Sequence, residues 1–185
     1  GAVEKLVGKC WQTNPEIIEG DQADKKRKET AWEKKSKQVF TNRFWRSFSE
    51  ADRRRLVGRY AGILLHVRDE KDWNLPVTKG RGLQKISVAW AGSLTVSEWD
   101  TGLNSKTYGQ PKMWQYAERL PNGSSRRVNI HPDRVFILGD YSDDAIGFLE
   151  PAYNAFVSLE KVEGGSGESF LKNAARQLNI NFDKE

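Results

Sequence analysis

Four aspartates between residues 133 and 144 could, by type and spacing, hold a divalent metal ion. They are Asp133, Asp140, Asp143 and Asp144, with His131 close by. Clustered carboxylates bind Mg²⁺ and can position a water molecule for cleavage of a phosphodiester bond. Three of the four nevertheless fall in one turn with a glycine and a serine, where aspartate is favoured because it suits turns and caps. We therefore favour a structural turn, and a metal-dependent nuclease that uses Asp133, Asp140 and Asp143 stays an alternative.

The remaining residues of catalytic type do not form a pattern that predicts an enzyme. His131 precedes a proline at a strand boundary, so we expect a structural or surface histidine, and His66 lies in an apolar run, so we expect a hydrogen-bonded core histidine. The single cysteine, Cys10, lies on an apolar stripe and is expected to be a small core residue. The glycine-rich segments 80–82 and 164–167 lack the spacing of nucleotide-binding loops. We predict no enzymatic activity, no cofactor and no metal.

Basic residues are concentrated in the first third of the chain. The formal net charge is +5, and residues 1–60 alone carry 15 Lys/Arg against 9 Asp/Glu. Such a density could pair with phosphates, and the affinity for DNA would then fall steeply with salt. Because lysine and glutamate interleave, we favour a solvated face or a protein interface over direct DNA contact. The candidate residues of this subunit or DNA interface are Lys25, Lys26, Arg27, Lys28, Arg53, Arg54 and Arg55.

The aromatic content indicates a chain that folds. The 8 Phe, 5 Tyr and 7 Trp supply large buried areas at few positions. Trp45, Trp73 and Trp99 stand beside polar neighbours and could anchor a subunit interface, although burial in a core accounts for each equally well. No run approaches the roughly 18 apolar residues of a membrane span, so no membrane partner is predicted. The chain begins at Gly1 and its only methionine is Met113, so we expect a piece of a longer polypeptide.

The elements that position these residues follow from the periodicity of apolar side chains. A hairpin turn is predicted at Asn122-Gly123, because this dipeptide readily adopts positive φ. A flexible break is predicted at residues 164–167 and a helix interruption at 47–49, followed by a weak capping box that starts at Ser49. Helices are expected at residues 1–10, 24–44, 49–60, 148–159 and 168–178, and strands at 16–19, 83–90, 94–98, 111–120, 126–130 and 134–138. Residues 62–67 are expected to form a buried strand or the end of a helix.

This order of elements predicts an α+β fold, with a mostly antiparallel sheet flanked by N-terminal and C-terminal helices. We expect three segments. Residues 1–46 form an N-terminal helical, basic segment, residues 47–163 an α+β body with a central sheet and a long helix, and residues 164–185 a C-terminal short helix.

Two stretches of the second half carry a likeness to a known family. They are Tyr108-Gly109-Gln110-Pro111, followed by a strand with Tyr116, and Val-Asn-Ile-His-Pro-Asp-Arg-Val at residues 128–135. With the helix that follows from Gly147 to Val162, they resemble the portal proteins of tailed bacteriophages, in a branch of phage-associated proteins of formerly unknown function. The likeness covers roughly residues 40–183.

The resemblance implies a structural protein of the virion. Portal proteins form a homo-oligomeric ring, usually a dodecamer, at one capsid vertex, where they contact the capsid, the packaging motor and later the tail or adaptor proteins. Double-stranded DNA passes through the assembled channel during packaging and ejection. This chain would correspond to the wing, the outer α+β body of the subunit, located at the portal vertex and in the host cytoplasm during assembly.

A ring closed head to tail joins two different faces of the subunit. The basic first third could therefore meet an acidic patch near residues 140–150 of the neighbouring subunit. A DNA-binding module that uses the basic face of residues 25–55 is the other alternative to the structural role.

Overall fold

The computed structural model of the chain describes residues 1–20 and 28–176. It divides into two compact units, Gly1–Phe148 and Leu149–Glu185. Some of the predictions lie outside the described residues. They are the start of the helix predicted at 24–44, the end of the helix predicted at 168–178, and the candidate residues Lys25, Lys26 and Arg27. The segment boundaries after residues 46 and 163 stay predictions.

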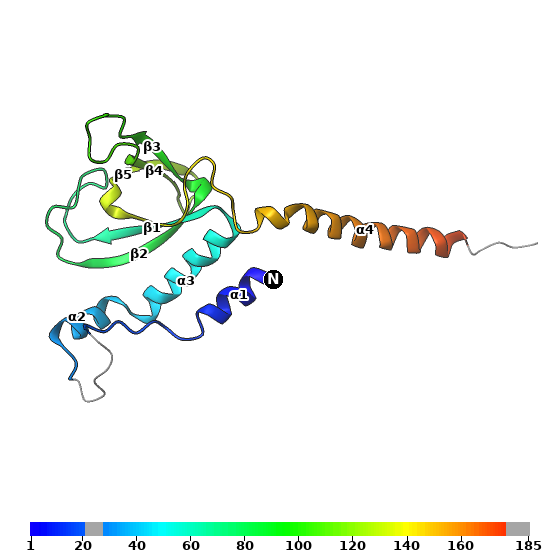
Figure 1. The fold of residues 1–185 in the computed structure, drawn as a ribbon, viewed down its shortest axis with the longest axis horizontal. Helices are drawn as coiled ribbons and strands as arrows, with labels where there is room; N and C mark the ends of the chain where they lie inside the picture. The colour runs from blue at the N-terminus through cyan, green and yellow to red at the C-terminus, as the bar shows by residue number, and fades with distance from the viewer. Residues whose placement is uncertain (21–27, 177–185) are drawn as a thin grey trace, which may run out of the picture. The chain divides into compact units, whose positions relative to one another are not determined.

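In its described part, the first unit contains helices on one side and two small sheets (Figure 1). The helices are α1 (Ala2–Cys10), α2 (Ala31–Val39) and α3 (Asn42–Val57). The strands are β1 (Tyr60–Val67), β2 (Leu83–Trp90), β3 (Leu94–Trp99), β4 (Pro111–Arg119), β5 (Ser125–Ile130) and β6 (Val135–Gly139), with short 3-10 turns η1 (Ala91–Ser93) and η2 (Pro132–Arg134).

Both sheets are antiparallel, with strand orders β2-β1-β6 and β3-β4-β5. The chain passes from the second sheet back to the first through η2, which joins β5 to β6. The predicted α+β class is therefore confirmed. The Asn-Gly hairpin is also confirmed, because Gly123 has a φ of +83° between β4 and β5.

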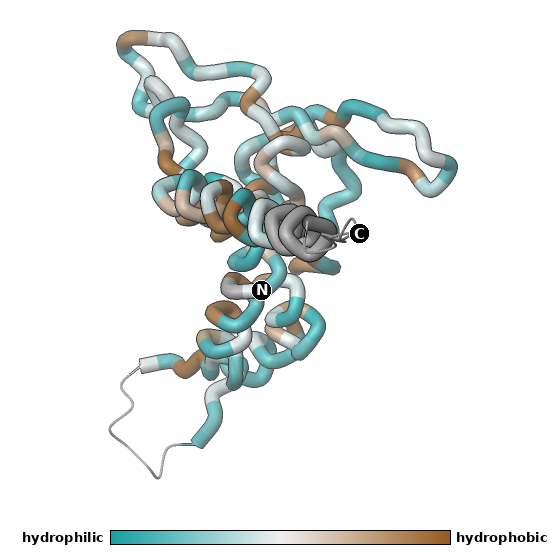
Figure 2. The backbone as a smooth tube through the Cα atoms, turned by 90° about the vertical axis from the view of Figure 1, so that its right-hand side faces the viewer, coloured by the Kyte–Doolittle hydropathy of each residue, from teal (hydrophilic) through white to brown (hydrophobic). Residues whose placement is uncertain are grey.

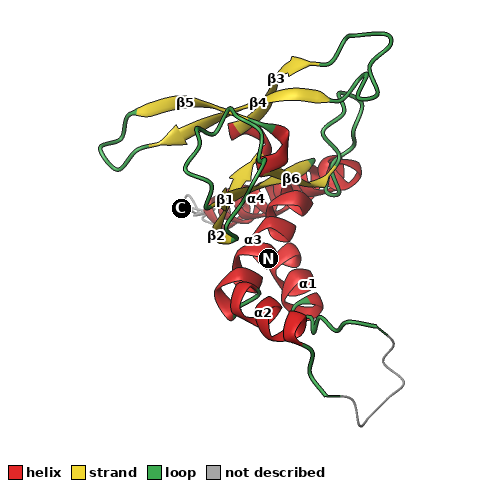
Figure 3. Cartoon of the chain, turned by 90° about the vertical axis from the view of Figure 1, so that its left-hand side faces the viewer, coloured by secondary structure: helices red, strands yellow, loops and turns green. Residues whose placement is uncertain are grey.

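The core lies on the two faces of β1. Ala61 and Ile63 pack with Ala51 of α3, whereas Tyr60 and Leu64 pack with residues of the second sheet. Those buried partners are Leu94, Trp114 and Ile130. Figure 3 shows the corresponding layers, with α3 beneath the β2-β1-β6 sheet and β3 to β5 above it. Because β1 is covered on both faces, it is apolar at successive positions rather than at alternate ones.

The helix boundary between α2 and α3 differs from the sequence prediction. The predicted helix over 24–44 ends at Val39, and the hydroxyl of Thr41 caps a new helix by accepting the N–H of Phe44 at 3.4 Å. The predicted interruption at 47–49 is wrong, because α3 runs through it. Ser49 caps no helix there, since its hydroxyl donates to the carbonyl of Arg46 at 3.0 Å.

The strand predicted at residues 16–19 is also wrong, since this segment has no regular secondary structure. Buried Glu33 ties it to α2 instead. The carboxylate of Glu33 accepts the backbone N–H groups of Glu19 and Thr30, each at 2.8 Å. A side-chain contact of this kind satisfies the segment's backbone without a partner strand.

The second unit contains a 3-10 turn, η3 (Glu150–Ala152), and the helix α4 (Tyr153–Arg176). The predicted flexible break at residues 164–167 is wrong, because α4 continues through it without interruption. Glycine costs a helix only about 1 kcal/mol relative to alanine, so a few glycines weaken a helix without ending it.

Candidate functional site

The motif residues His131 to Arg134 form the η2 turn that links the two sheets. Pro132 opens the turn, and the N–H of Asp133 donates to Nδ1 of His131 at 3.2 Å, so the histidine side chain caps it. Proline at the first position has no N–H to satisfy and a backbone angle already suited to a helical turn. The turn therefore aims the next residue, Arg134, into the protein.

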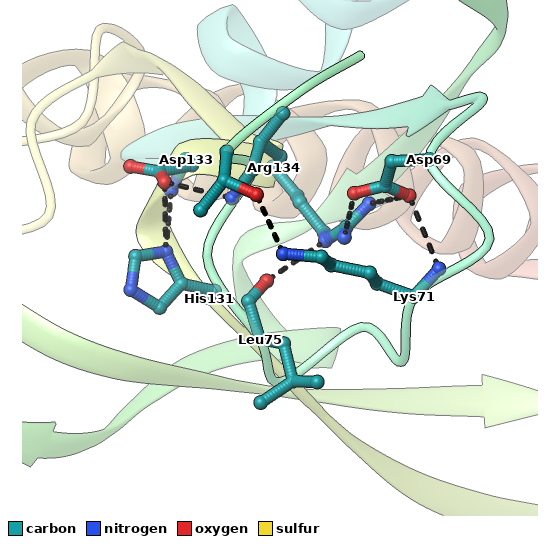
Figure 4. A network of polar contacts seen from close by, with 8 residues as sticks. Asp69, Lys71, Leu75, His131, Asp133 and Arg134 are labelled. Carbon is teal, nitrogen blue, oxygen red and sulfur yellow. Dashed lines mark hydrogen bonds and ion pairs between the residues drawn. The ribbon is translucent and has the colours of Figure 1, made fainter. Parts of the chain in front are cut away.

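Arg134 is the largest fully buried side chain of the described residues, 2% exposed. Its guanidinium makes a two-pronged ion pair with Asp69, with Nη1–Oδ1 at 3.2 Å and Nη2–Oδ2 at 2.5 Å (Figure 4). The third donor, Nε, reaches the carbonyl of Leu75 at 3.3 Å. The hydrogen bond from Arg134 holds the pKa of Asp69 below its ordinary value of 3.8. A charge-assisted pair of this geometry is stronger than a neutral hydrogen bond.

The partners of this turn belong to one loop, residues 68–82 between β1 and β2, which we call the strap loop. Besides Asp69 and Leu75, the loop is held at Val77, whose N–H donates to Oδ2 of Asp133 at 3.0 Å. The N–H of His131 donates to the carbonyl of Trp73 at 2.8 Å. The motif turn therefore fastens the strap loop at four points.

The strap loop also carries internal contacts. Nζ of Lys71 donates to the hydroxyl of Thr78 at 2.6 Å across the loop (Figure 4). Among the described residues, no buried side-chain nitrogen or oxygen lacks a hydrogen-bond partner. Every buried polar side-chain atom of the network therefore has a hydrogen-bond partner, as expected for side chains that hold a loop in place. We call this set of contacts the clamp.

Of the aspartates considered as metal ligands, Asp140 stabilises a backbone turn and Asp133 holds the strap loop. Asp140 accepts both the N–H of Ser142, at 2.8 Å, and its hydroxyl, at 2.7 Å, which confirms the predicted turn. The hydroxyl of Ser142 lowers the pKa of Asp140 below 3.8. Asp143 and Asp144 are exposed. Within the described ranges, His, Cys, Asp and Glu side chains form no group of three that could hold a metal ion.

The candidate arginines of α3 lie close to carboxylates of the same helix. Arg53 and Arg54 both pair with Glu50, Arg54 at 2.8 Å, and Arg55 pairs with Asp52 at 2.6 Å. Arg54 also donates to the carbonyl of Val88 at 2.7 Å and lies 5.0 Å from the centre of the Trp90 ring. The carboxylates of Glu50 and Asp52 balance most of this positive charge. The three arginines therefore add little net charge to the predicted basic face. Lys28 is exposed.

The histidine and cysteine predictions have different outcomes. His66 is partly buried, lies edge-on to Trp73 and exchanges a hydrogen bond with the hydroxyl of Ser87 at 2.8 Å. Burial lowers the pKa of His66 below 6.5, and the positive charge of Lys85 adds to the effect. The predicted hydrogen bond of His66 is confirmed, but the residue is only partly buried rather than in the core. Cys10 is exposed, so its assignment to the core is wrong.

The tryptophans named as possible anchors lie in different surroundings. Trp45 is partly buried in an aromatic cluster where α1, α2 and α3 meet, with Trp11, Phe40, Phe44 and Phe48. Trp73 is half-buried in the strap loop, and Trp99 remains 41% exposed at the end of β3. Trp99 is therefore the most accessible of the three.

Sequence reasoning named His131 and Asp133 but missed the partners of Arg134. Asp69 and the strap loop lie about 65 residues away along the chain, and no local pattern marks them. A buried arginine requires a carboxylate partner, so a partner for Arg134 could have been expected if its burial had been known. The signal in the sequence was the two-residue spacing of His131 and Asp133, which is typical of a capped turn.

Within the described residues, buried Arg134 and Glu33 hold backbone segments in place. A family model described as phage portal protein matches residues 2–181. The chain therefore belongs to the phage portal protein family, a family of structural proteins. No curated protein matches the chain. None of the helices in the described ranges combines the length and the apolar character that crossing a membrane requires.

Proposed function

We propose that this chain is the wing segment of a portal subunit, which assembles into a homo-oligomeric ring at the capsid vertex through which DNA is packaged and ejected. The family match over residues 2–181 carries this proposal. The clamp between η2 and the strap loop supports it, because the residues of the portal-like motif act here to stiffen the body of the subunit.

The surface of the chain supports subunit contacts. Several large apolar side chains remain outside the core of the first unit, among them Trp90 at 42% and Phe136 at 49% exposure. Helices α1 to α3 carry mostly hydrophilic residues broken by short hydrophobic stretches (Figure 2). Mixed surfaces of this kind are common in interfaces that combine aromatic anchors with a polar rim.

In this proposal the chain has no catalytic role. Its partners are further copies of itself, the capsid, the packaging motor and the tail or adaptor proteins, and its location is the virion's portal vertex after assembly in the host cytoplasm. The candidate interface of Lys25, Lys26, Arg27, Lys28, Arg53, Arg54 and Arg55 stays part of the proposal as a protein contact. The local pairing of Arg53 to Arg55 with carboxylates disfavours the alternative of a DNA-binding module.

Native mass spectrometry of the complete gene product tests the proposal. We expect a closed ring of identical subunits, and a strictly monomeric protein at every concentration would contradict it. Two assays on the same sample address the alternatives. Magnesium-dependent cleavage of DNA would favour the nuclease, and salt-dependent binding of duplex DNA by the unassembled chain would favour the DNA-binding module.

A further inference from the structure

A shallow groove of about 610 Å³ lies on the first unit between α1, α3 and β2. Its apolar lining comes from Val7 of α1 and from Ile86 and Val88 of β2. Its basic lining comes from α3, where Arg46 and Arg53 lie seven residues apart on one face and Arg54 directly follows Arg53. The lining also contains Glu4 and Glu50, which pair with Arg53 and Arg54, so the groove offers an apolar strip edged by charged side chains.

One of these guanidinium groups is available for a partner. Arg53 and Arg54 already pair with Glu50, but the exposed side chain of Arg46 makes no hydrogen bond or ion pair with any described residue. Across the whole of α3, five arginines stand against one glutamate and one aspartate. This edge of the groove therefore favours an acidic occupant.

Helix α4 of the second unit has the complementary surface. Tyr153, Phe156, Leu159 and Val162 follow each other at steps of three and are 65%, 50%, 55% and 63% exposed. Residues spaced by three form a continuous ridge on a helix. Glu160 and Glu163 lie beside this ridge, and residues 149–166 carry three glutamates against a single lysine, Lys161.

The two surfaces also match in length. The arginine edge from Arg46 to Arg54 spans about 12 Å of helix, and the ridge from Tyr153 to Val162 about 14 Å, at 1.5 Å per residue. An exposed apolar ridge of this length is unusual for a helix that stays in water, because soluble helices bury such a stripe.

We propose that α4 of one copy of this chain docks its Tyr153–Val162 ridge in the α1-α3-β2 groove of a second copy, with Glu160 and Glu163 facing Arg46. The occupant is a second copy because the acidic, apolar ridge and the basic, apolar groove belong to the same sequence. The contact is heterologous, since it joins two different faces, and repetition of it generates a ring or a filament. This inference rests on the proposed ring and names the surfaces that would form it.

Cysteine cross-linking between two variants tests the contact in trans. In a Cys10→Ser background, one variant carries Ser49→Cys in the groove and the other carries Leu159→Cys on the ridge. The two proteins are mixed and oxidised, and the matched control replaces Leu159→Cys by Lys161→Cys, which lies on the opposite side of α4. We expect the disulfide-linked pair of unlike chains to be about tenfold more abundant with Leu159→Cys than with the control.

A second measurement uses charge. Arg46→Glu should weaken self-association about tenfold, and combining it with Glu163→Lys should restore it, because the two reversed charges again attract. Equal cross-linking by the ridge and control variants would overturn the docking site. If native mass spectrometry still shows rings, only this inference fails. If it shows monomers alone, the proposed function fails with it.

Discussion

Arg134 shows how a single buried charge can organise a surface loop. Its guanidinium is almost fully buried, yet each of its three donor groups has an acceptor in the strap loop. An ion pair that is buried and completely hydrogen-bonded adds little net stability compared with an apolar pair, but the loss of one partner is costly. The strap loop therefore depends on this residue more than on any of its surface ion pairs.

Replacing Arg134 by methionine should lower the free energy of unfolding by about 3 kcal/mol, because a buried carboxylate would lose its counter-ion. Urea denaturation followed by tryptophan fluorescence measures the change. Arg126→Met is the matched control. Its side chain is 63% exposed and pairs with Glu118 on the surface, so we expect less than about 1 kcal/mol. Equal losses in the two variants would show that the clamp does not hold the loop.

His66 should make stability depend on pH. Burial lowers its pKa in the folded protein below 6.5, so the unfolded chain binds a proton more readily. The contribution of neutral His66 is complete above about pH 6.5 and declines as the pH falls below that value towards the folded pKa. We expect His66→Gln to flatten the decline of the urea midpoint between about pH 7.5 and pH 5.5. The same slope in both proteins would rule out this histidine as its source.

At the scale of elements, the two sheets pack tightly against each other at Gly62. This residue lies on the central strand β1, and a Cβ atom added there would lie 2.1 Å from Cδ2 of Leu94, which is itself fully buried. A side chain at this position would have to push the sheets apart. The glycine is therefore required by packing rather than by backbone conformation.

Gly62→Ala should destabilise the fold by about 1–3 kcal/mol through overpacking. Gly92→Ala is a suitable control, because a Cβ atom there has no neighbour within 4 Å. Thermal unfolding of the two variants compares them directly. A loss at Gly92 as large as that at Gly62 would contradict the packing between the sheets.

In helix α4 we expect that replacing glycine by alanine stabilises the protein instead of destabilising it. Gly164 and Gly165 lie inside the helix, and a Cβ atom at either position would meet nothing within 4 Å. Each change to alanine should stabilise the helix by about 0.5–1 kcal/mol. Circular dichroism at 222 nm during thermal unfolding detects the gain, and a lower helical signal in the double variant would contradict a continuous α4.

The sequence predicted the sheet better than the helix breaks, for physical reasons. Strands from β2 to β6 begin within one residue of their predicted starts, because apolar residues alternate between turns that are rich in glycine, proline and polar residues. The interruption predicted at residues 47–49 is absent because Phe44, Trp45 and Phe48 pack together on the same helix. At these residues, tertiary packing outweighs the local preference for a helix break.

The candidate site was predictable only in part, for a related reason. The structural role of His131 and the turn at Asp140 follow from local preferences and were predicted, whereas Asp133 was named only as a candidate metal ligand. The ion pair of Arg134 with Asp69 joins residues far apart in the chain. The hydrogen bond from Arg54 to the carbonyl of Val88 depends on how α3 lies on β2. Contacts between residues this far apart in the chain can be identified only when the arrangement of the helices and sheets is known.

At the scale of the whole molecule, membership in the phage portal protein family and an α+β body held by a buried clamp give a consistent picture. The first unit carries an excess of positive charge, and the described part of the second unit carries an excess of negative charge. A chain whose parts differ in this way can associate through unlike faces, as a ring requires.

Electron cryomicroscopy of the portal vertex tests the central claim most directly. The phage that encodes this chain would be imaged, and the first unit, Gly1–Phe148, would be fitted into the reconstruction without change. We expect its two sheets and α3 to occupy the outer body of every subunit in a ring around the DNA channel. A vertex whose ring subunits have no place for this fold would contradict the proposed role.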